Sequence, residues 1–152
     1  MGLGAMRVRF LVSIVLALAA TAVMCVAPAS SNAPRSALTA GPSAFGRILF
    51  DGRGFVLYAF TRDPRGKSVC VGGCARAWPP YLVKTRPQAG SGVKARLLGT
   101  TKRAGGRLQV TYAGRPLYYY VGDRRAGQIL CQNVTEFGGV WRVIRPTGTL
   151  VR

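Results

Sequence analysis

The sequence predicts an all-β domain built from two tandem pseudo-repeats of short antiparallel strands. Residues 46–63, GRILFDGRGFVLYAFTRD, return without a gap at residues 106–123 as GRLQVTYAGRPLYYYVGD. Each copy consists of two alternating apolar runs around a glycine-containing turn, the pattern of a β-hairpin. We expect the two copies to pack as one small domain after an N-terminal signal helix.

The first 29 residues have the pattern of a secretory signal peptide. Arg7 and Arg9 precede an apolar run over residues 10–26, and Ala27-Pro28-Ala29 supplies small residues for cleavage. An uncleaved anchor is the alternative, because the run is at the short end of what spans a bilayer. The leader therefore predicts export, with the chain either released or held at the outer face of the cell membrane.

Cys25 has two interpretations. Bacterial lipoproteins are cut just before a cysteine that is then acylated, and lipidation of Cys25 would hold the chain at the membrane. Met24 stands where such a signal needs a small residue, so Cys25 can equally be one more apolar residue of the leader. Contact with the membrane is expected only through the leader or a lipid on Cys25.

Residues 30–44 are predicted to form a flexible linker, because they are small and polar, contain proline and show no periodicity. The first repeat is assigned to residues 45–92 and the second to residues 93–150. Side chains alternate across a strand, so Tyr58 and Phe60 are expected on one face and Leu57 on the other. In the second hairpin Leu108, Val110 and Tyr112 are expected to face the core.

Each copy ends in a Tyr-x-aromatic-x-x-Asp motif, formed by Tyr58, Phe60 and Asp63 and by Tyr118, Tyr120 and Asp123. The rings are expected to belong to the core; exposed beside basic residues, they would instead stack bases or sugars. The aspartates are expected to cap the backbone of a turn. Their alternative is a glycosidase-like carboxylate pair, if the repeats bring them close together.

The cysteines of the mature chain are expected to be structural. Cys70 and Cys74 frame two glycines, which predicts a small disulfide loop, and pairing of either with Cys131 is the alternative. A reactive thiol or a cysteine-held metal remains a third possibility. The chain has no His, and all three Met lie in the leader, which excludes a Ser-His-Asp triad and most metal chemistry. No cofactor or metal is expected.

The charge of the chain is strongly positive. It has 22 Lys and Arg against 4 Asp and Glu, and removal of residues 1–29 takes away only Arg7 and Arg9, leaving a formal charge of +16. The basic residues are spread over the loops. Outside the cell such a charge favours binding to anionic envelope polymers or extracellular nucleic acid by counterion release.

Taken together, these motifs resemble a family of bacterial exported lipoproteins built from tandem secreted repeats. The resemblance rests on both Tyr-x-aromatic-x-x-Asp motifs, the Cys70–Cys74 loop, Trp78-Pro79-Pro80 and the closing Gly138-Gly139-Val140-Trp141, and it covers residues 45–148. It implies an exported protein and no established activity. We therefore expect a binding or structural module of the cell envelope without catalysis. The alternative is a thiol/redox or electron-transfer accessory protein.

Overall fold

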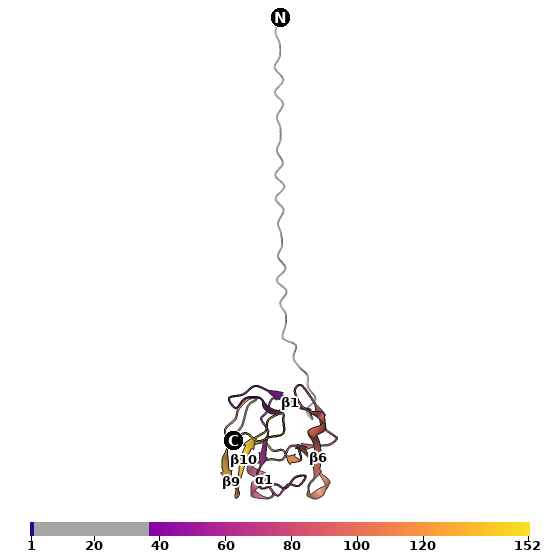
Figure 1. Cartoon of the computed structure of the whole chain (residues 1–152), viewed down its shortest axis with the longest axis vertical. Helices are drawn as coiled ribbons and strands as arrows, with labels where there is room; N and C mark the ends of the chain where they lie inside the picture. Colours follow the sequence, from indigo (N-terminus) through magenta and orange to yellow (C-terminus); the bar gives the residue numbers. More distant parts are fainter. Residues whose placement is uncertain (2–36) are drawn as a thin grey trace. The chain divides into compact units, whose positions relative to one another are not determined.

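The computed structural model describes Met1 and residues 37–152. The predicted signal peptide, Cys25 and residues 30–36 of the predicted linker lie outside the described residues. Strands are the main regular structure of residues 37–152 (Figure 1). The strands are β1 Ala37–Gly41, β2 Ile48–Asp51, β3 Tyr58–Phe60, β4 Leu82–Val83, β5 Gln88–Ala89, β6 Leu98–Lys102, β7 Leu108–Tyr112, β8 Arg115–Pro116, β9 Val134–Glu136 and β10 Gly139–Val143.

Helical structure is limited to short turns in the described part of the chain: α1 Gly73–Ala77, η1 Ala95–Leu97 and η2 Ala104–Gly106. No helix within residues 37–152 has the length and apolar character needed to cross a membrane. The predicted all-β class is therefore confirmed.

The strands form three small sheets, with the orders β2-β1-β5, β3-β10-β9 and β4-β7-β6; β8 pairs with β7. Every pair is antiparallel except β1–β5, which is parallel. In Figure 1, β9 and β10 lie on one side of the domain and β6 on the other. The sheet β3-β10-β9 joins β3 of the first repeat to β9 and β10 of the second, so the repeats share a sheet.

The predicted linker ends earlier than the sequence suggested, because β1 lies within residues 30–44. It pairs with β2 in the register Leu38↔Asp51 to Gly41↔Ile48, and Leu38 is fully buried. The small residues of β1 show no strand pattern in the sequence, because the segment is held as a strand by its pairing with β2. The folded domain thus begins by residue 37.

Both predicted hairpin turns form, but their second arms leave the hairpin. Phe50 forms a bridge with Val56 in the first repeat, and β7 pairs with β8 in the second. Beyond these turns, Tyr58 pairs with Tyr118, each amide donating to the other's carbonyl at 2.9 Å. The two motif strands therefore meet each other across the repeats.

The core consists of two apolar clusters on opposite faces of these strands. Tyr58 and Phe60 belong to one cluster, and Leu57 and Ala59 to the other, as the alternation predicted. In the second repeat Val110 and Tyr112 are buried as expected, whereas Leu108 is only partly buried and lines a surface pocket.

Candidate functional site

The two motif tyrosines are hydrogen-bonded to the aspartate of the opposite repeat. The Tyr58 hydroxyl donates to Asp123 Oδ2 at 2.7 Å, and the Tyr118 hydroxyl donates to Asp63 Oδ2 at 2.5 Å. Burial and these bonds raise the pKa of both tyrosines. Each motif is therefore completed by the other copy, and the motif links the repeats.

The second oxygen of each aspartate caps a loop. Asp63 Oδ1 accepts from the Val69 amide at 2.8 Å, and Asp123 Oδ1 accepts from the Leu130 amide at 3.0 Å. Burial raises the pKa of both carboxyls, against hydrogen bonds that lower it. Because both oxygens of each carboxylate are occupied inside the domain, the geometry supports the capping role rather than a glycosidase-like pair.

Four rings form a column across the centre of the domain. Phe60 stacks on Trp141 with centroids 4.3 Å apart, Trp141 stacks on Trp78 at 4.0 Å, and Trp78 lies 4.7 Å from Tyr120. Each repeat therefore supplies two of the four rings, one from its motif and one tryptophan outside the motif.

The motif tyrosines close this column from the sides. Tyr58 meets Trp78 edge-on, and Tyr118 meets Trp141 edge-on, with centroid distances of 5.2 and 5.1 Å. Tyr58, Phe60 and Tyr118 are buried, and Tyr120 is partly exposed at the end of the column. The predicted placement of these rings in the core agrees with the structure, with Tyr120 at its margin.

The Tyr118–Asp63 pair extends into a partly buried polar network that the sequence did not predict. Arg103 donates to Ser68 Oγ at 2.5 Å and to Gln109 Oε1 at 2.7 Å. The Ser68 hydroxyl lies 2.6 Å from the Tyr118 oxygen and donates to it, because the Tyr118 proton is directed to Asp63. Gln109 stands where the first copy has Leu49, so a polar residue at an apolar repeat position was the available signal.

All four acidic side chains accept hydrogen bonds from other residues of the domain. Besides Asp63 and Asp123, Asp51 is buried and accepts from the Arg53 guanidinium at 2.8 Å and from the Tyr119 hydroxyl at 3.0 Å. Glu136 accepts from Trp78 Nε1 at 2.8 Å. The Arg53–Asp51 pair is the only ion pair within the described residues.

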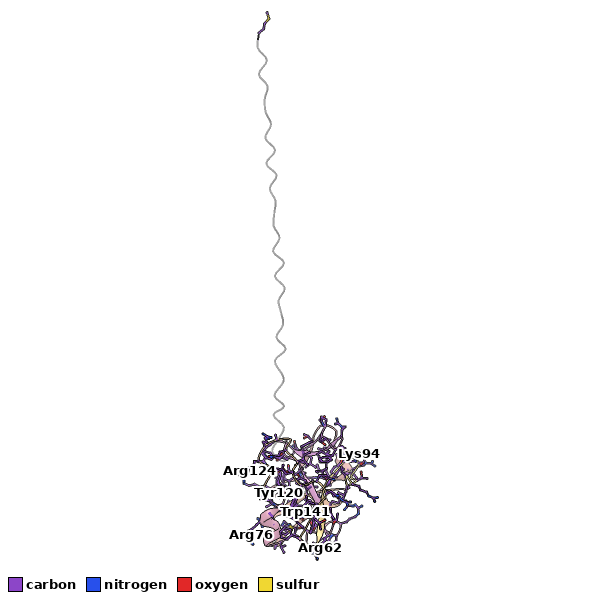
Figure 2. All side chains as sticks on the ribbon, turned by 90° about the vertical axis from the view of Figure 1, so that its left-hand side faces the viewer. Arg62, Arg76, Lys94, Tyr120, Arg124 and Trp141 are labelled. Atoms are coloured by element: carbon purple, nitrogen blue, oxygen red, sulfur yellow. A yellow bond between two sulfur atoms is a disulfide. The ribbon has the colours of Figure 1, made fainter. Side chains whose placement is uncertain are left out.

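The basic side chains, by contrast, face solvent. Apart from Arg7, Arg9 and Arg35, the 22 Lys and Arg lie within residues 37–152, and 15 of these 19 are exposed. Figure 2 shows four of them, Arg62, Arg76, Lys94 and Arg124, at different edges of the domain. The surface of the domain is therefore cationic with almost no compensating charge.

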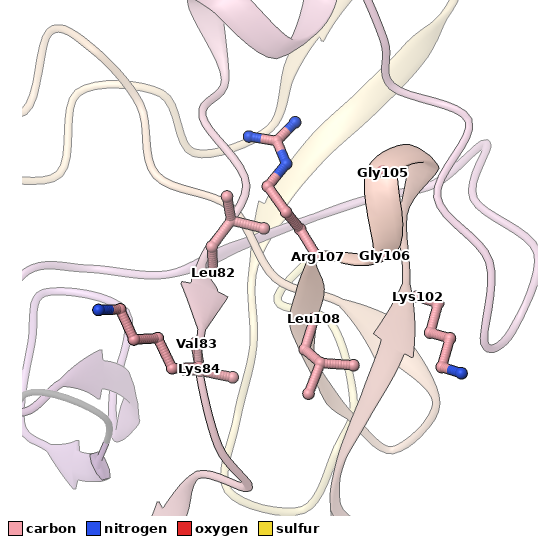
Figure 3. Close-up of a pocket in the computed structure, with 8 residues that line it drawn as sticks. All are labelled: Leu82, Val83, Lys84, Lys102, Gly105, Gly106, Arg107 and Leu108. Carbon is pink, nitrogen blue, oxygen red and sulfur yellow. The ribbon is translucent and has the colours of Figure 1, made fainter.

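Two neighbouring pockets gather part of this charge. One, of about 770 Å³, has an apolar floor of Leu82, Val83 and Leu108, and Figure 3 shows Lys84 and Lys102 on opposite sides of it. The other, of about 480 Å³, is lined by residues that include Lys67, Lys102, Arg103 and Arg107. Lys102 and Arg107 line both pockets, so the two pockets adjoin, and together they are called here the basic groove.

The comparison with known families covers part of both repeats. A family model described as a secreted repeat of unknown function matches residues 42–81 and 99–145, more than half of the chain. The chain belongs to this secreted-repeat family. Its members are described as secreted, so the protein is an exported module of uncharacterised role. No curated protein and no solved structure matched the chain.

In this secreted-repeat protein the predicted Cys70–Cys74 disulfide is formed, which makes the alternative pairing with Cys131 wrong. Cys131 is free and buried, directly after the residue whose amide Asp123 caps, just as Cys70 follows the residue capped by Asp63. Cys131 is thus the second repeat's counterpart of Cys70, but it forms no disulfide within residues 37–152. The described residues contain no cluster of three His, Cys, Asp or Glu that could hold a metal.

The Cys131 thiol is expected to be unreactive in the folded protein. Burial raises its pKa above the ordinary 9.0, which opposes the thiolate form that attacks disulfides. We predict that a thiol-specific disulfide reagent at pH 8 labels Cys131 only at the rate of unfolding, and at once in denaturant. Fast labelling of the native protein would instead favour the redox interpretation.

Proposed function

We propose that this secreted-repeat protein is an envelope module that adheres to anionic polymers through its cationic surface. The observation that supports the proposal most directly is that all four acidic side chains are tied to internal partners while 15 basic side chains are exposed. Polyanion binding to such a surface releases counterions and is steered over long range.

The basic groove is the best candidate for the centre of contact. Its two pockets adjoin at Lys102 and Arg107, and the apolar floor of the larger one adds contact for the uncharged part of a polymer. Lys67, Lys84 and Arg103 add positive charge along it. A polymer with regularly spaced negative charges fits this arrangement better than a single small anion.

Retention at the outer face of the membrane, through the leader or a lipid on Cys25, is part of the same proposal. A lipidated mass beginning at Cys25, in protein purified from its own envelope, would support it. A mature mass beginning after residue 29 would indicate release.

The adhesion is expected to weaken steeply with salt. For contact with about four phosphates, the logarithm of the association constant should fall with the logarithm of salt concentration at a slope of about −3 to −4. Titration of a labelled polyanion at several salt concentrations measures this slope. The double variant Lys102→Gln with Arg107→Gln is expected to make this negative slope less steep by about one to two.

The matched control removes equal charge elsewhere. Lys94 and Arg96 are both exposed and do not line the basic groove, so Lys94→Gln with Arg96→Gln should change the slope less. Binding that is unchanged between low and high salt would rule out the proposed function.

A further inference from the structure

A third pocket, of about 470 Å³, is lined by four arginines contributed by both repeats. Arg65 lies in the turn after β3, Arg115 in β8, Arg142 in β10, and Arg152 near the C-terminal end of the chain; residues 148–150 complete the wall. We call it the arginine pocket. It shares no lining residue with the basic groove.

No carboxylate side chain balances this pocket. The four acidic side chains are engaged elsewhere, and none of the four pocket arginines forms an ion pair with another described residue. Arg142 Nε donates to Asn133 Oδ1 at 3.0 Å, and Arg65 donates to the Ala113 carbonyl. Arg115 Nε is buried and has no hydrogen-bond partner within the described part of the chain.

The other repeat shows that the fold does not require arginine at two of these four positions. The Gly66 amide donates to the Gly114 carbonyl, and the Gly127 amide donates to the Gly54 carbonyl, so the two loops occupy equivalent places. The residue before each loop glycine is Arg65 in one case and Ala126 in the other. By the same repeat, Arg115 corresponds to Phe55.

The placement of Arg115 is costly without a ligand. It is partly buried, and burial, followed by the nearby charge of Arg65, lowers its pKa below the ordinary value of an arginine. A buried donor without a partner adds the desolvation cost of that group. Phenylalanine and alanine stand at the positions equivalent to Arg115 and Arg65, so packing does not explain these two arginines, whereas a bound anion would relieve both costs.

We propose that the arginine pocket binds a phosphate group of a phosphodiester polymer. Guanidinium groups bind phosphate oxygens in pairs and remain charged, which makes clustered arginines suited to this anion. The pocket's volume lies in the range of ligand sites and exceeds what one free ion needs. The inference rests on the proposed function and narrows its substrate class from polyanions in general to phosphodiesters.

The test uses exposed residues, so that folding is preserved. The pocket variant Arg65→Ala with Arg152→Ala is compared with Arg124→Ala with Arg125→Ala, which removes the same charge from exposed residues outside the pocket. The probes are a short oligothymidylate, a glycerol phosphate oligomer with as many phosphates, and an oligoglutamate of equal charge.

We expect the pocket variant to bind both phosphodiester probes about tenfold more weakly, since it loses hydrogen bonds to charged groups. Its affinity for oligoglutamate should fall no more than that of the control variant. A loss confined to one phosphodiester probe would still support the proposal and identify the polymer backbone. Equal losses for the pocket and control variants on every probe would overturn it, while salt-dependent polyanion binding by the parent would leave the proposed function standing.

A direct readout complements the affinities. The Nε–H resonance of Arg115 in the unmodified protein should shift on addition of at least one of the two phosphodiester probes, and should stay unchanged with oligoglutamate. An Arg115 resonance that responds to neither phosphodiester probe, or that responds as strongly to oligoglutamate, would overturn the phosphate assignment.

Discussion

Replacing Trp141 with alanine is expected to cost about 3 to 5 kcal/mol of the free energy of unfolding. Trp141 is fully buried in the centre of the ring column, stacked between Phe60 and Trp78 and contacted edge-on by Tyr118. Its removal would leave a cavity lined by these three rings, and the cavity adds to the loss of the ring's own contacts. Since small domains are stable by only about 5 to 15 kcal/mol, urea denaturation should show a variant near the limit of folding.

Two controls separate this cavity from other effects. Trp141→Phe keeps a ring in the column and also removes the indole Nε1, which is buried without a partner in the described structure, so its loss should be well below that of alanine. Phe137→Ala changes an exposed ring and should stay within about 0.5 kcal/mol of the parent. A Trp141→Ala variant as stable as Phe137→Ala would contradict the column's role.

Replacing Asp123 with alanine is expected to destabilise the domain by about 2 to 4 kcal/mol. The change leaves the buried Tyr58 hydroxyl without its acceptor and the Leu130 amide without its cap. The partial relief of a buried charge offsets part of this loss, because burial disfavours the ionised form of Asp123. Thermal and urea unfolding measure the net effect.

The matched control for Asp123 is Glu136, which is exposed and bonded to one indole. Glu136→Ala removes the same charge and should cost clearly less. Asp123→Asn keeps an oxygen for the Leu130 amide and should fall between the two. Equal losses for the Asp123 and Glu136 alanine variants would mean that general charge, and not the capping geometry, sets the stability.

The repeat in the sequence predicted the fold class, but it did not predict that the tyrosine of each copy is hydrogen-bonded to the aspartate of the other. Alternation in residues 55–60 correctly separated Tyr58 and Phe60 from Leu57 and Ala59. Nothing in one copy could show that its tyrosine is bonded to the aspartate of the other, because both pairings satisfy the same motif. Which of the two pairings forms depends on how the repeats are packed together, including the pairing of β3 with β10, and this appears only in the structure.

The features of the site that are present in only one of the two repeats were the hardest to predict. The Arg103–Ser68–Tyr118 chain and the free Cys131 exist on one side of the pseudo-symmetric core only. The arginine pocket joins residues far apart in sequence, so the charge pattern suggested a uniformly spread surface. Differences between equivalent positions, such as Phe55 and Arg115, carried the information that the motif itself lacked.

The most direct test of the account is a pair of double-mutant cycles on the free energy of unfolding. The account predicts that Tyr58→Phe and Asp123→Asn, whose side chains lie 2.7 Å apart, are coupled by about 0.5 to 3 kcal/mol. Tyr58→Phe and Asp63→Asn, which belong to one motif copy but share no hydrogen bond, should be additive within about 0.5 kcal/mol. Strong coupling within the copy and none across the repeats would contradict the reciprocal Tyr–Asp pairing.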